Sequence, residues 1–264
     1  MSFSSNSSNI KHPKYGIDRP DIIVLCSVGG TLSIAVASSL FASHIFPSLV
    51  SAILLALGLA IGILGLLVAT ALMVSTKVTK FTQRDRLLDL IDWSAVRDVL
   101  DVGCGPGLLL VGAAKRFETG RAVGVDIWQR YAESGNRAEV TLANAEFEGV
   151  AENVEVSDGD IRALPFPDST FDVVLSRNVL QNMKHRADRQ KGIEEILRVL
   201  RPVGQIGLIL VDSWNLDEYL SILRQNDVKI LKLLKPPPYF LPGLLFLTTV
   251  VARKSNDRVS EADG

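Results

Sequence analysis

The chain has few cysteines, few histidines and almost no net charge. Its 264 residues include two Cys and three His, and the formal net charge at pH 7 is −1. Two cysteines, Cys26 and Cys104, cannot form a disulfide framework, which is compatible with a reducing compartment. The balance of charges gives no electrostatic reason to expect nucleic acid as a partner. No His, Cys, Asp and Glu residues have the spacing of metal ligands, so no metal is expected.

Charged side chains are missing altogether from one long stretch. Residues 22–76 contain no Asp, Glu, Lys or Arg. A membrane span needs about 20 apolar residues, so this stretch is long enough for two. The sequence predicts one span over residues 22–46 and another over residues 49–75, with a tight turn at Pro47 and Ser48.

Basic residues flank this apolar block, and the connection inside it carries no charge. They are Lys11, Lys14 and Arg19 before the block and Lys77, Lys80, Arg84 and Arg86 after it. By the positive-inside tendency, both ends are expected on the cytoplasmic side, which predicts an integral membrane protein in an unidentified membrane. The alternatives are a cleaved targeting peptide, whose apolar region is shorter and nearer the start, and a soluble hairpin, whose outer face carries charge.

Small residues in the block suggest how its two segments pack. Gly58 and Gly62 have the four-residue spacing that lets helices approach closely. Ala35 and Ser39 in the first segment are expected to accept that approach. Packing within the hairpin is favoured over dimerisation through the same glycines.

Beyond the block, apolar strands alternate with helical segments. Strands are expected over residues 98–102, 122–126, 154–160, 171–176, 205–211, 228–234 and 244–252, and helices over 108–117, 138–149, 193–200 and 217–224. This alternation predicts an α/β fold: a Rossmann-like, doubly wound, mostly parallel seven-stranded sheet with helices on both faces. The expected organisation is a polar tail (1–20), a transmembrane hairpin (21–76), an amphipathic linker helix (77–94), the α/β domain (95–254) and a disordered tail (255–264).

The most informative segment is residues 98–107, where an apolar strand runs into a glycine-rich turn. Gly103, Gly105 and Gly107 remove three side chains, so the backbone can take unusual φ values and a ligand can approach closely. Before a helix, such a turn presents N–H groups and the positive end of the helix dipole. Open α/β sheets bind nucleotide-like ligands there, which predicts an enzyme with a nucleotide-like cofactor.

The order of motifs resembles the class I S-adenosylmethionine-dependent methyltransferases over residues 95–254, in particular the small-molecule ones, which include quinone- and sterol-modifying enzymes. The matching elements are the loop 101–107, Asp126, the pair Gly159–Asp160, the segment 164–174 and the segment 200–204. Val203 stands where that family usually has glycine. The resemblance implies methyl transfer with S-adenosylmethionine as the cofactor.

The resemblance also implies which residues contact the cofactor. Asp101 is expected to attract the ammonium group of the cofactor, and Gly103, Gly105 and Gly107 are expected to lie against its methionine and ribose portions. Asp126 is expected to bind the ribose hydroxyls, and Ile127 or Trp128 to pack on the adenine face. Asp160 and the Ile161 N–H are expected at the adenine edge, and Ser176 at the cofactor tail or the substrate.

Structural roles compete with these assignments. Asp126 and Asp160 could be helix N-caps, and Trp128 could be ordinary packing. Cys104 has no evident partner base and is interpreted as a small loop residue. A dinucleotide dehydrogenase shares the acidic residue after the second strand, but its G-x-G-x-x-G fingerprint is absent from the loop. The only candidate for a catalytic base is His185, which sits in a charged segment typical of a solvated turn.

An anchored domain lies where lipid-soluble molecules partition, so a small, hydrophobic acceptor is expected. The apolar segment 236–243 could form a lid, a membrane contact or a plain connection between strands. A membrane-anchored protein methyltransferase and a non-catalytic scaffold that retains the fold are the alternatives.

Overall fold

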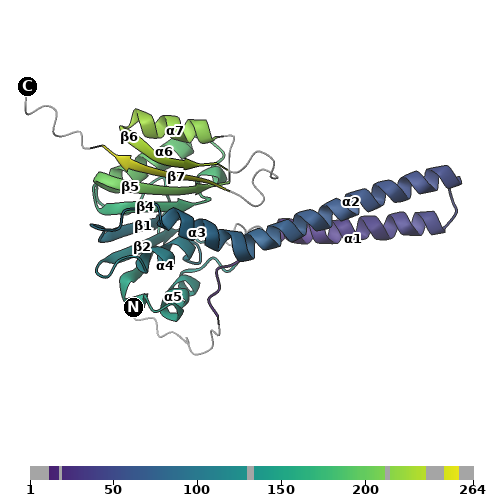
Figure 1. Ribbon diagram of the computed structural model, residues 1–264, viewed down its shortest axis with the longest axis horizontal. Helices are drawn as coiled ribbons and strands as arrows, with labels where there is room; N and C mark the ends of the chain where they lie inside the picture. The colour runs from purple at the N-terminus through teal and green to yellow at the C-terminus, as the bar shows by residue number, and fades with distance from the viewer. Residues whose placement is uncertain (1–11, 18–19, 130–133, 212–214, 236–246, 256–264) are drawn as a thin grey trace, which may run out of the picture.

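A two-helix hairpin projects from an α/β domain (Figure 1). The computed structural model of the chain describes residues 12–17, 20–129, 134–211, 215–235 and 247–255. The hairpin consists of α1 (Pro20–Ala42) and α2 (Ser48–Val74), and α2 continues through a π-helical stretch, η1 (Ser75–Thr79), into α3 (Lys80–Leu88). The helix expected over residues 77–94 is therefore an extension of the second hairpin helix and ends at Leu88.

The hairpin helices pack against each other at small residues. A Cβ added to Gly58 would lie 2.2 Å from the Cβ of Ala37, and one added to Gly62 would lie 2.7 Å from the carbonyl oxygen of Gly30. Side chains at the two α2 glycines would therefore push the helices apart. Glycine is needed here for close approach of the backbones and not for an unusual φ.

The residues of α1 that face these glycines are not the predicted ones. Ala35 and Ser39 are exposed, whereas Ala37 is buried. Two residues along an α-helix correspond to a rotation of about 200°, so Ala35 and Ser39 lie on the side opposite Ala37. The prediction that they accept α2 is wrong because glycine spacing on one helix does not define the facing side of its partner.

The domain is built on one seven-stranded sheet with the order β3-β2-β1-β4-β5-β7-β6. The strands are β1 (Asp98–Val102), β2 (Arg121–Asp126), β3 (Val154–Asp158), β4 (Phe171–Arg177), β5 (Leu200–Leu210), β6 (Val228–Leu234) and β7 (Thr248–Lys254). The first five are parallel, and β7 pairs antiparallel with both β5 and β6. The predicted α/β class with a mostly parallel seven-stranded sheet is confirmed.

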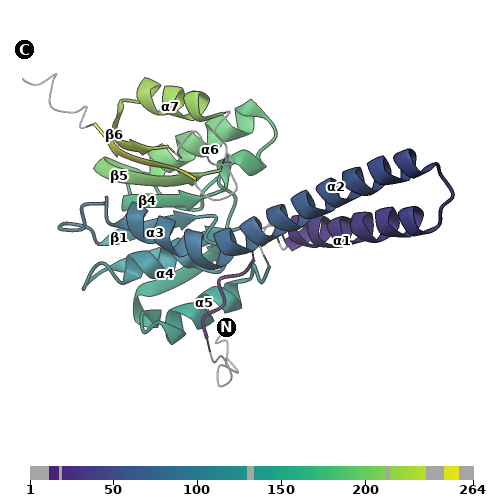
Figure 2. The same ribbon diagram turned by 45° about the vertical axis from the view of Figure 1, so that its right-hand side comes forward.

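Helices cover both faces of the sheet (Figure 2). They are α4 (Leu108–Ala114), α5 (Ala138–Phe147), α6 (Arg186–Val199) and α7 (Leu216–Gln225), with short 3-10 turns η2 (Ala151–Asn153) and η3 (Leu180–Asn182). One core joins the sheet to α6 and α7, and the other joins it to α3, α4 and α5. Successive strand residues alternate between the two, as Leu208 and Ile209 of β5 do.

The fifth strand begins earlier than predicted. β5 starts at Leu200, which pairs with Phe171, and the register shifts before Val173 pairs with Gln205. In the resulting bulge Val203 has a φ of 59°. A branched side chain is disfavoured in this left-handed region, so the backbone is strained where the resembled family usually has glycine. The third strand is shorter than expected and ends at Asp158.

Candidate active site

The ends of four parallel strands form the rim of a cavity. The register pairs Val102 with both Val125 and Ser176, and Asp126 with Asp158, so β1, β2, β3 and β4 end at the same edge of the sheet. The cavity at this edge has a volume of about 640 Å³, within the range of small-molecule sites. This is the edge at which open α/β sheets bind ligands.

The glycine-rich turn forms one wall of this cavity. Gly103 and Gly105 line the cavity and have φ values of 70° and 52°. A Cβ on Gly103 would lie 2.2 Å from Cγ2 of Val179, so both the backbone conformation and the space require glycine there. The Gly103 N–H donates to the carbonyl oxygen of Val125 at 2.7 Å, which holds the turn over β2.

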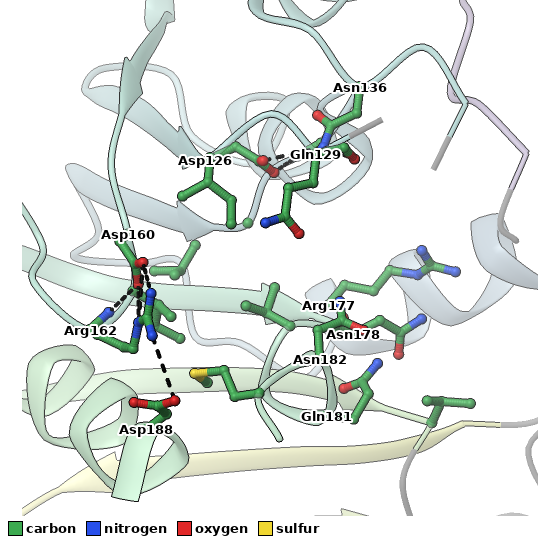
Figure 3. Close-up of a pocket in the computed structure, with 18 of the residues that line it drawn as sticks. Asp126, Gln129, Asn136, Asp160, Arg162, Arg177, Asn178, Gln181, Asn182 and Asp188 are labelled. Atoms are coloured by element: carbon green, nitrogen blue, oxygen red, sulfur yellow. Dashed lines mark hydrogen bonds and ion pairs between the residues drawn. The ribbon is translucent and has the colours of Figure 1, made fainter. Parts of the chain in front are cut away.

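The carboxylate of Asp126 connects this turn to the end of β2. Oδ2 accepts the N–H of Gly105 at 2.9 Å, and Oδ1 accepts the N–H of Trp128 at 2.6 Å and the side-chain amide of Asn136 at 3.2 Å. Residues 127–129 directly after Asp126 are not helical, and the next helix that the structure describes is α5 from Ala138, so the helix N-cap interpretation of Asp126 is wrong. Two carboxylate oxygens offer about four acceptor positions, which leaves capacity for a ligand hydroxyl. Figure 3 shows Asp126 and Asn136 side by side at one end of the cavity.

Asp160 lies on the cavity wall in an ion pair. The Arg162 guanidinium donates from Nε to both carboxylate oxygens, at 3.0 and 3.1 Å, and from a terminal nitrogen at 2.6 Å. The hydrogen bonds from Arg162 hold the pKa of Asp160 below its usual value. A second carboxylate, Asp188, lies 3.6 Å from the same guanidinium (Figure 3). Asp160 also accepts the Arg162 N–H, which is a local turn and not a helix N-cap.

The structure brings seven of the residues singled out from the sequence to the cavity wall and leaves four away from it. On the wall are Gly103, Gly105, Asp126, Ile127, Asp160, Ile161 and His185. Away from it are Asp101, Gly107, Trp128 and Ser176. The segment 236–243 lies outside the described residues. These positions do not test the contacts with a cofactor, which stay predictions.

Each residue away from the wall has a local partner. Asp101 is buried and accepts the Leu110 N–H of α4 at 2.9 Å, and Ser176 donates to the carbonyl oxygen of Val102. The indole N–H of Trp128 donates to Asp158. Gly107 precedes α4 with a φ of 87°, and a Cβ there would lie 2.8 Å from Thr141.

His185 lies at the N-terminal cap of α6, exposed, and lines the cavity. Its side chain makes no capping hydrogen bond. The location is compatible with proton transfer to or from a ligand, and the role of His185 as a base stays a prediction.

Comparisons with known proteins identify the domain. Residues 99–204 match the family described as methyltransferase domain. The chain is 38% identical over 111 residues to an uncharacterized methyltransferase of Schizosaccharomyces pombe, covering 41% of this chain and 37% of the relative. It is also 38% identical over 120 residues to the ubiquinone/menaquinone biosynthesis C-methyltransferase of Hydrogenovibrio crunogenus, covering 44% of each. The chain carries a class I S-adenosylmethionine-dependent methyltransferase domain.

A solved structure agrees with this assignment of the fold. Geranyl diphosphate methyltransferase in complex with geranyl diphosphate and sinefungin superimposes with a TM-score of 0.51 at 19% identity, covering 66% of this chain and 78% of that one. The cofactor of the methyltransferase domain is S-adenosylmethionine, as the resemblance implied. The chain spans less than half the length of the two curated relatives, 37% and 44%.

The cavity of the methyltransferase domain fits such a cofactor. Beside Asp126, the side-chain oxygen of Asn136 is buried and has no hydrogen-bond partner within the described part of the chain. A buried acceptor without a donor costs about 1–3 kcal/mol, which a hydroxyl-bearing ligand would offset. The side chain of Ile127 is 51% exposed at the same end of the cavity, where a flat apolar base could cover it.

Several residues of the methyltransferase site were not found from the sequence. Thr141 donates its hydroxyl to the Gly105 carbonyl at 2.6 Å, and Asn144 donates its amide to the Pro106 carbonyl at 2.8 Å. Both side chains are fully buried and come from α5, so they hold the glycine-rich turn from outside. A polar residue within a predicted helix does not by itself indicate that its side chain binds a distant turn. Further residues on the cavity wall that the sequence did not indicate are Leu72, Ser75, Thr76, Asn136, Gln181 and Asn182.

Proposed function

We propose that this chain is a membrane-anchored methyltransferase that transfers a methyl group from S-adenosylmethionine to a small, hydrophobic acceptor. The observation that carries the proposal is the cavity itself. One end combines a glycine-rich turn, the Asp126 carboxylate and the exposed Ile127 side chain, and the cavity extends beyond them to the amide side chains of Asn178 and Gln181. The first end suits a nucleoside, and the second leaves room for an acceptor.

The residues of the chain act by positioning. S-adenosylmethionine, when bound, supplies a methyl carbon activated by a sulfonium. The chain would then contribute alignment of the acceptor and exclusion of water. Asp126 would accept hydrogen bonds from the ribose hydroxyls, Gly103 and Gly105 would let the backbone approach, and Ile127 would pack on the adenine.

The two-helix hairpin supports the proposal that the chain is anchored in a membrane. The two helices Pro20–Ala42 and Ser48–Leu88 are long and apolar enough to cross a membrane, with mean hydropathies of 2.0 and 2.8. Only 11% and 17% of their most apolar windows are buried, whereas a core helix of a soluble protein is mostly buried. Exposed apolar side chains such as Leu25 and Leu49, at 71% and 72% exposure, favour a lipid environment. The basic flanks favour a domain on the cytoplasmic side.

The nature of the acceptor is inferred from the anchor and from similar proteins. A domain held at a membrane meets molecules that partition into lipid. One similar protein is named for ubiquinone/menaquinone biosynthesis, and one similar fold binds geranyl diphosphate. Ubiquinone, menaquinone and geranyl diphosphate all carry prenyl chains, so a hydrophobic acceptor for this chain is consistent with these similarities.

The cofactor site is tested by calorimetric titration of S-adenosylmethionine into the full chain in phospholipid nanodiscs. Asp126→Asn is expected to raise Kd at least tenfold, because hydrogen bonds to a charged group contribute about 1.5–3 kcal/mol. The control is Asp158→Asn, whose residue ends the neighbouring strand but lies off the cavity wall. A folded wild-type chain that binds neither S-adenosylmethionine nor S-adenosylhomocysteine would favour the non-catalytic scaffold.

The anchor and the acceptor are tested in membranes that contain the full chain. Retention in the membrane pellet after alkaline carbonate extraction is expected. With methyl-tritiated S-adenosylmethionine and a total lipid extract, the label is expected in the organic phase. Label found only in the protein pellet would favour the protein methyltransferase instead.

A further inference from the structure

The base of the hairpin is attached rigidly to the methyltransferase domain. The helix runs without a break from Ser48 to Leu88. Its last part enters the core, where Leu87 and Leu88 are completely buried. A Cβ added to Gly207 of β5 would lie 3.1 Å from Leu87, and one added to Gly112 of α4 would lie 2.9 Å from Leu88. The position of the hairpin base relative to the sheet is therefore determined by core packing.

The same helix forms part of the cavity wall. Leu72 at the end of α2 and Ser75 and Thr76 in η1 line the cavity together with Gly103 and Asp126. A π-helical stretch inside an α-helix is uncommon and often lies at a functional site. Here the π-helical stretch lies where the hairpin helix reaches the cavity wall.

The hairpin residues on the cavity wall lie where the uncharged run of the sequence ends. Thr76 is the last residue of the uncharged run, and Lys77 is the first charged residue after it. Lys77 is exposed, and basic residues at the end of a membrane helix lie at the level of the lipid headgroups. With the hairpin inserted as proposed, the hairpin side of the cavity faces the interface between membrane and water.

The cavity lining contains both apolar and polar side chains. Besides Leu72 of the hairpin helix, the apolar lining residues include Val211 after β5 and Leu247 before β7. Amide side chains follow β4, where the buried oxygens of Asn178 and Gln181 have no hydrogen-bond partner within the described ranges. Figure 3 shows Asn178, Gln181 and Asn182 gathered across the cavity from Asp126. A ligand with N–H or O–H donors would satisfy acceptor atoms of this kind.

From this arrangement, and on the basis of the proposed function, we propose that the acceptor is a membrane-resident amphiphile that enters at the hairpin base. Its apolar chain lies against Leu72, Val211 and Leu247. Its neutral polar end, a hydroxyl or phenol, donates to Asn178 and Gln181. The hairpin is then a wall of the active site as well as an anchor, and the substrate need not leave the lipid phase completely.

The experiment uses the full chain in phosphatidylcholine nanodiscs with S-adenosylhomocysteine and, as a probe, a long-chain alkyl phenol with a diazirine in its chain. After irradiation, the labelled residues are identified by peptide mass spectrometry. Labels are expected on the cavity wall, at Leu72, Val211 or Leu247, besides the lipid-facing residues of the hairpin. A short-chain, water-soluble analogue is expected to label the wall at least fivefold less.

A pair of tryptophan variants makes the test specific. Leu72→Trp fills the hairpin side of the cavity and is expected to lower labelling of the other wall residues at least fivefold. Val74→Trp, on the exposed side of the same helix at 46% exposure, is expected to leave labelling unchanged.

The inference is overturned if labels in the wild-type chain occur only on lipid-facing residues, or if the short-chain analogue labels the wall equally. The calorimetric titration in the same discs separates the two proposals. If the wild-type chain binds the cofactor but its cavity wall is not labelled, only entry from the membrane is overturned. If the wild-type chain does not bind the cofactor, the proposed function itself is contradicted.

Discussion

One buried amide, that of Asn144, joins three parts of the chain. Its side-chain oxygen accepts the Lys14 N–H at 2.7 Å, and its nitrogen donates to the carbonyl oxygens of Lys14 at 3.0 Å and Pro106 at 2.8 Å. The residue is completely buried. Asn144 therefore fastens both the segment before the hairpin and the glycine-rich turn to α5.

Asn144→Ala is expected to destabilise the protein and to weaken cofactor binding. Loss of the amide leaves buried backbone groups without partners, which costs about 1–3 kcal/mol, and it releases the turn that approaches the cofactor. The measurements are denaturant unfolding and calorimetric titration with S-adenosylmethionine in detergent. Glu146→Ala, at an exposed position of the same helix, is the control. Equal stability and Kd for the two variants would contradict this role of Asn144.

The hairpin behaves as one packed element because its helices meet at backbone-to-backbone contacts. Gly62 lies so close to α1 that an added Cβ would be 2.3 Å from Cγ1 of Ile34. The hydroxyl of Ser33 donates to the Gly58 carbonyl at 3.1 Å, which adds a polar contact between the helices. In lipid such close packing replaces the hydrophobic effect as the source of helix association.

Gly62→Leu is expected to separate the two helices, because its side chain would occupy the space now filled by Ile34 and the Gly30 carbonyl oxygen. Spin labels attached at Leu32 and Ile61, which are 60% and 62% exposed, report the separation by pulsed electron resonance. A longer and broader distance distribution is expected for Gly62→Leu. Gly29→Leu is the matched control, since a Cβ there meets nothing within 4 Å. An unchanged distribution for Gly62→Leu would show that the hairpin does not depend on this contact.

Carboxylates paired in the fold couple the stability of the domain to pH. Burial raises the pKa of Asp172, but hydrogen bonds from Arg201 and from the Asp98 and Arg97 N–H groups outweigh it, so the pKa lies below the usual value. These bonds connect β4 to the start of β1 and to β5. Hydrogen bonds from Arg198 likewise lower the pKa of Glu195.

A carboxylate with a lowered pKa in the folded state stabilises the fold above its unfolded pKa, about 4. That stability is lost as the pH falls through the folded pKa. Asp172→Asn is expected to lower stability at pH 7 and to flatten its dependence on pH between about 5 and 3. Urea unfolding over this range is the measurement, and Asp168→Asn, with its side chain 77% exposed, is the control. Parallel pH curves for Asp172→Asn and the wild type would contradict the prediction.

Much of the fold and part of the site could be predicted from the sequence, because both depend on local patterns. An uncharged stretch of 55 residues and a regular alternation of strands and helices indicate a hairpin and a parallel sheet. Glycine spacing and the acid at the end of β2 indicate the ligand edge. Parallel strands bring their carboxyl ends together, so Gly103, Asp126 and Asp160 meet whatever the details of packing.

The remaining features depend on contacts between segments that are distant in the sequence. The bond from Asn144 to Pro106 spans 38 residues, and the bonds from Lys80 to the carbonyls of Tyr15 and Gly16 span 65 and 64. In the sequence, Leu72 is one of many apolar residues of a predicted membrane helix, and no neighbouring residue indicates a cavity. Leu72 lies on the cavity wall because α3, at the end of the same helix, is buried in the core. This burial determines how the whole helix passes the edge of the sheet. Local sequence specifies which elements form, and their packing specifies which of their side chains meet.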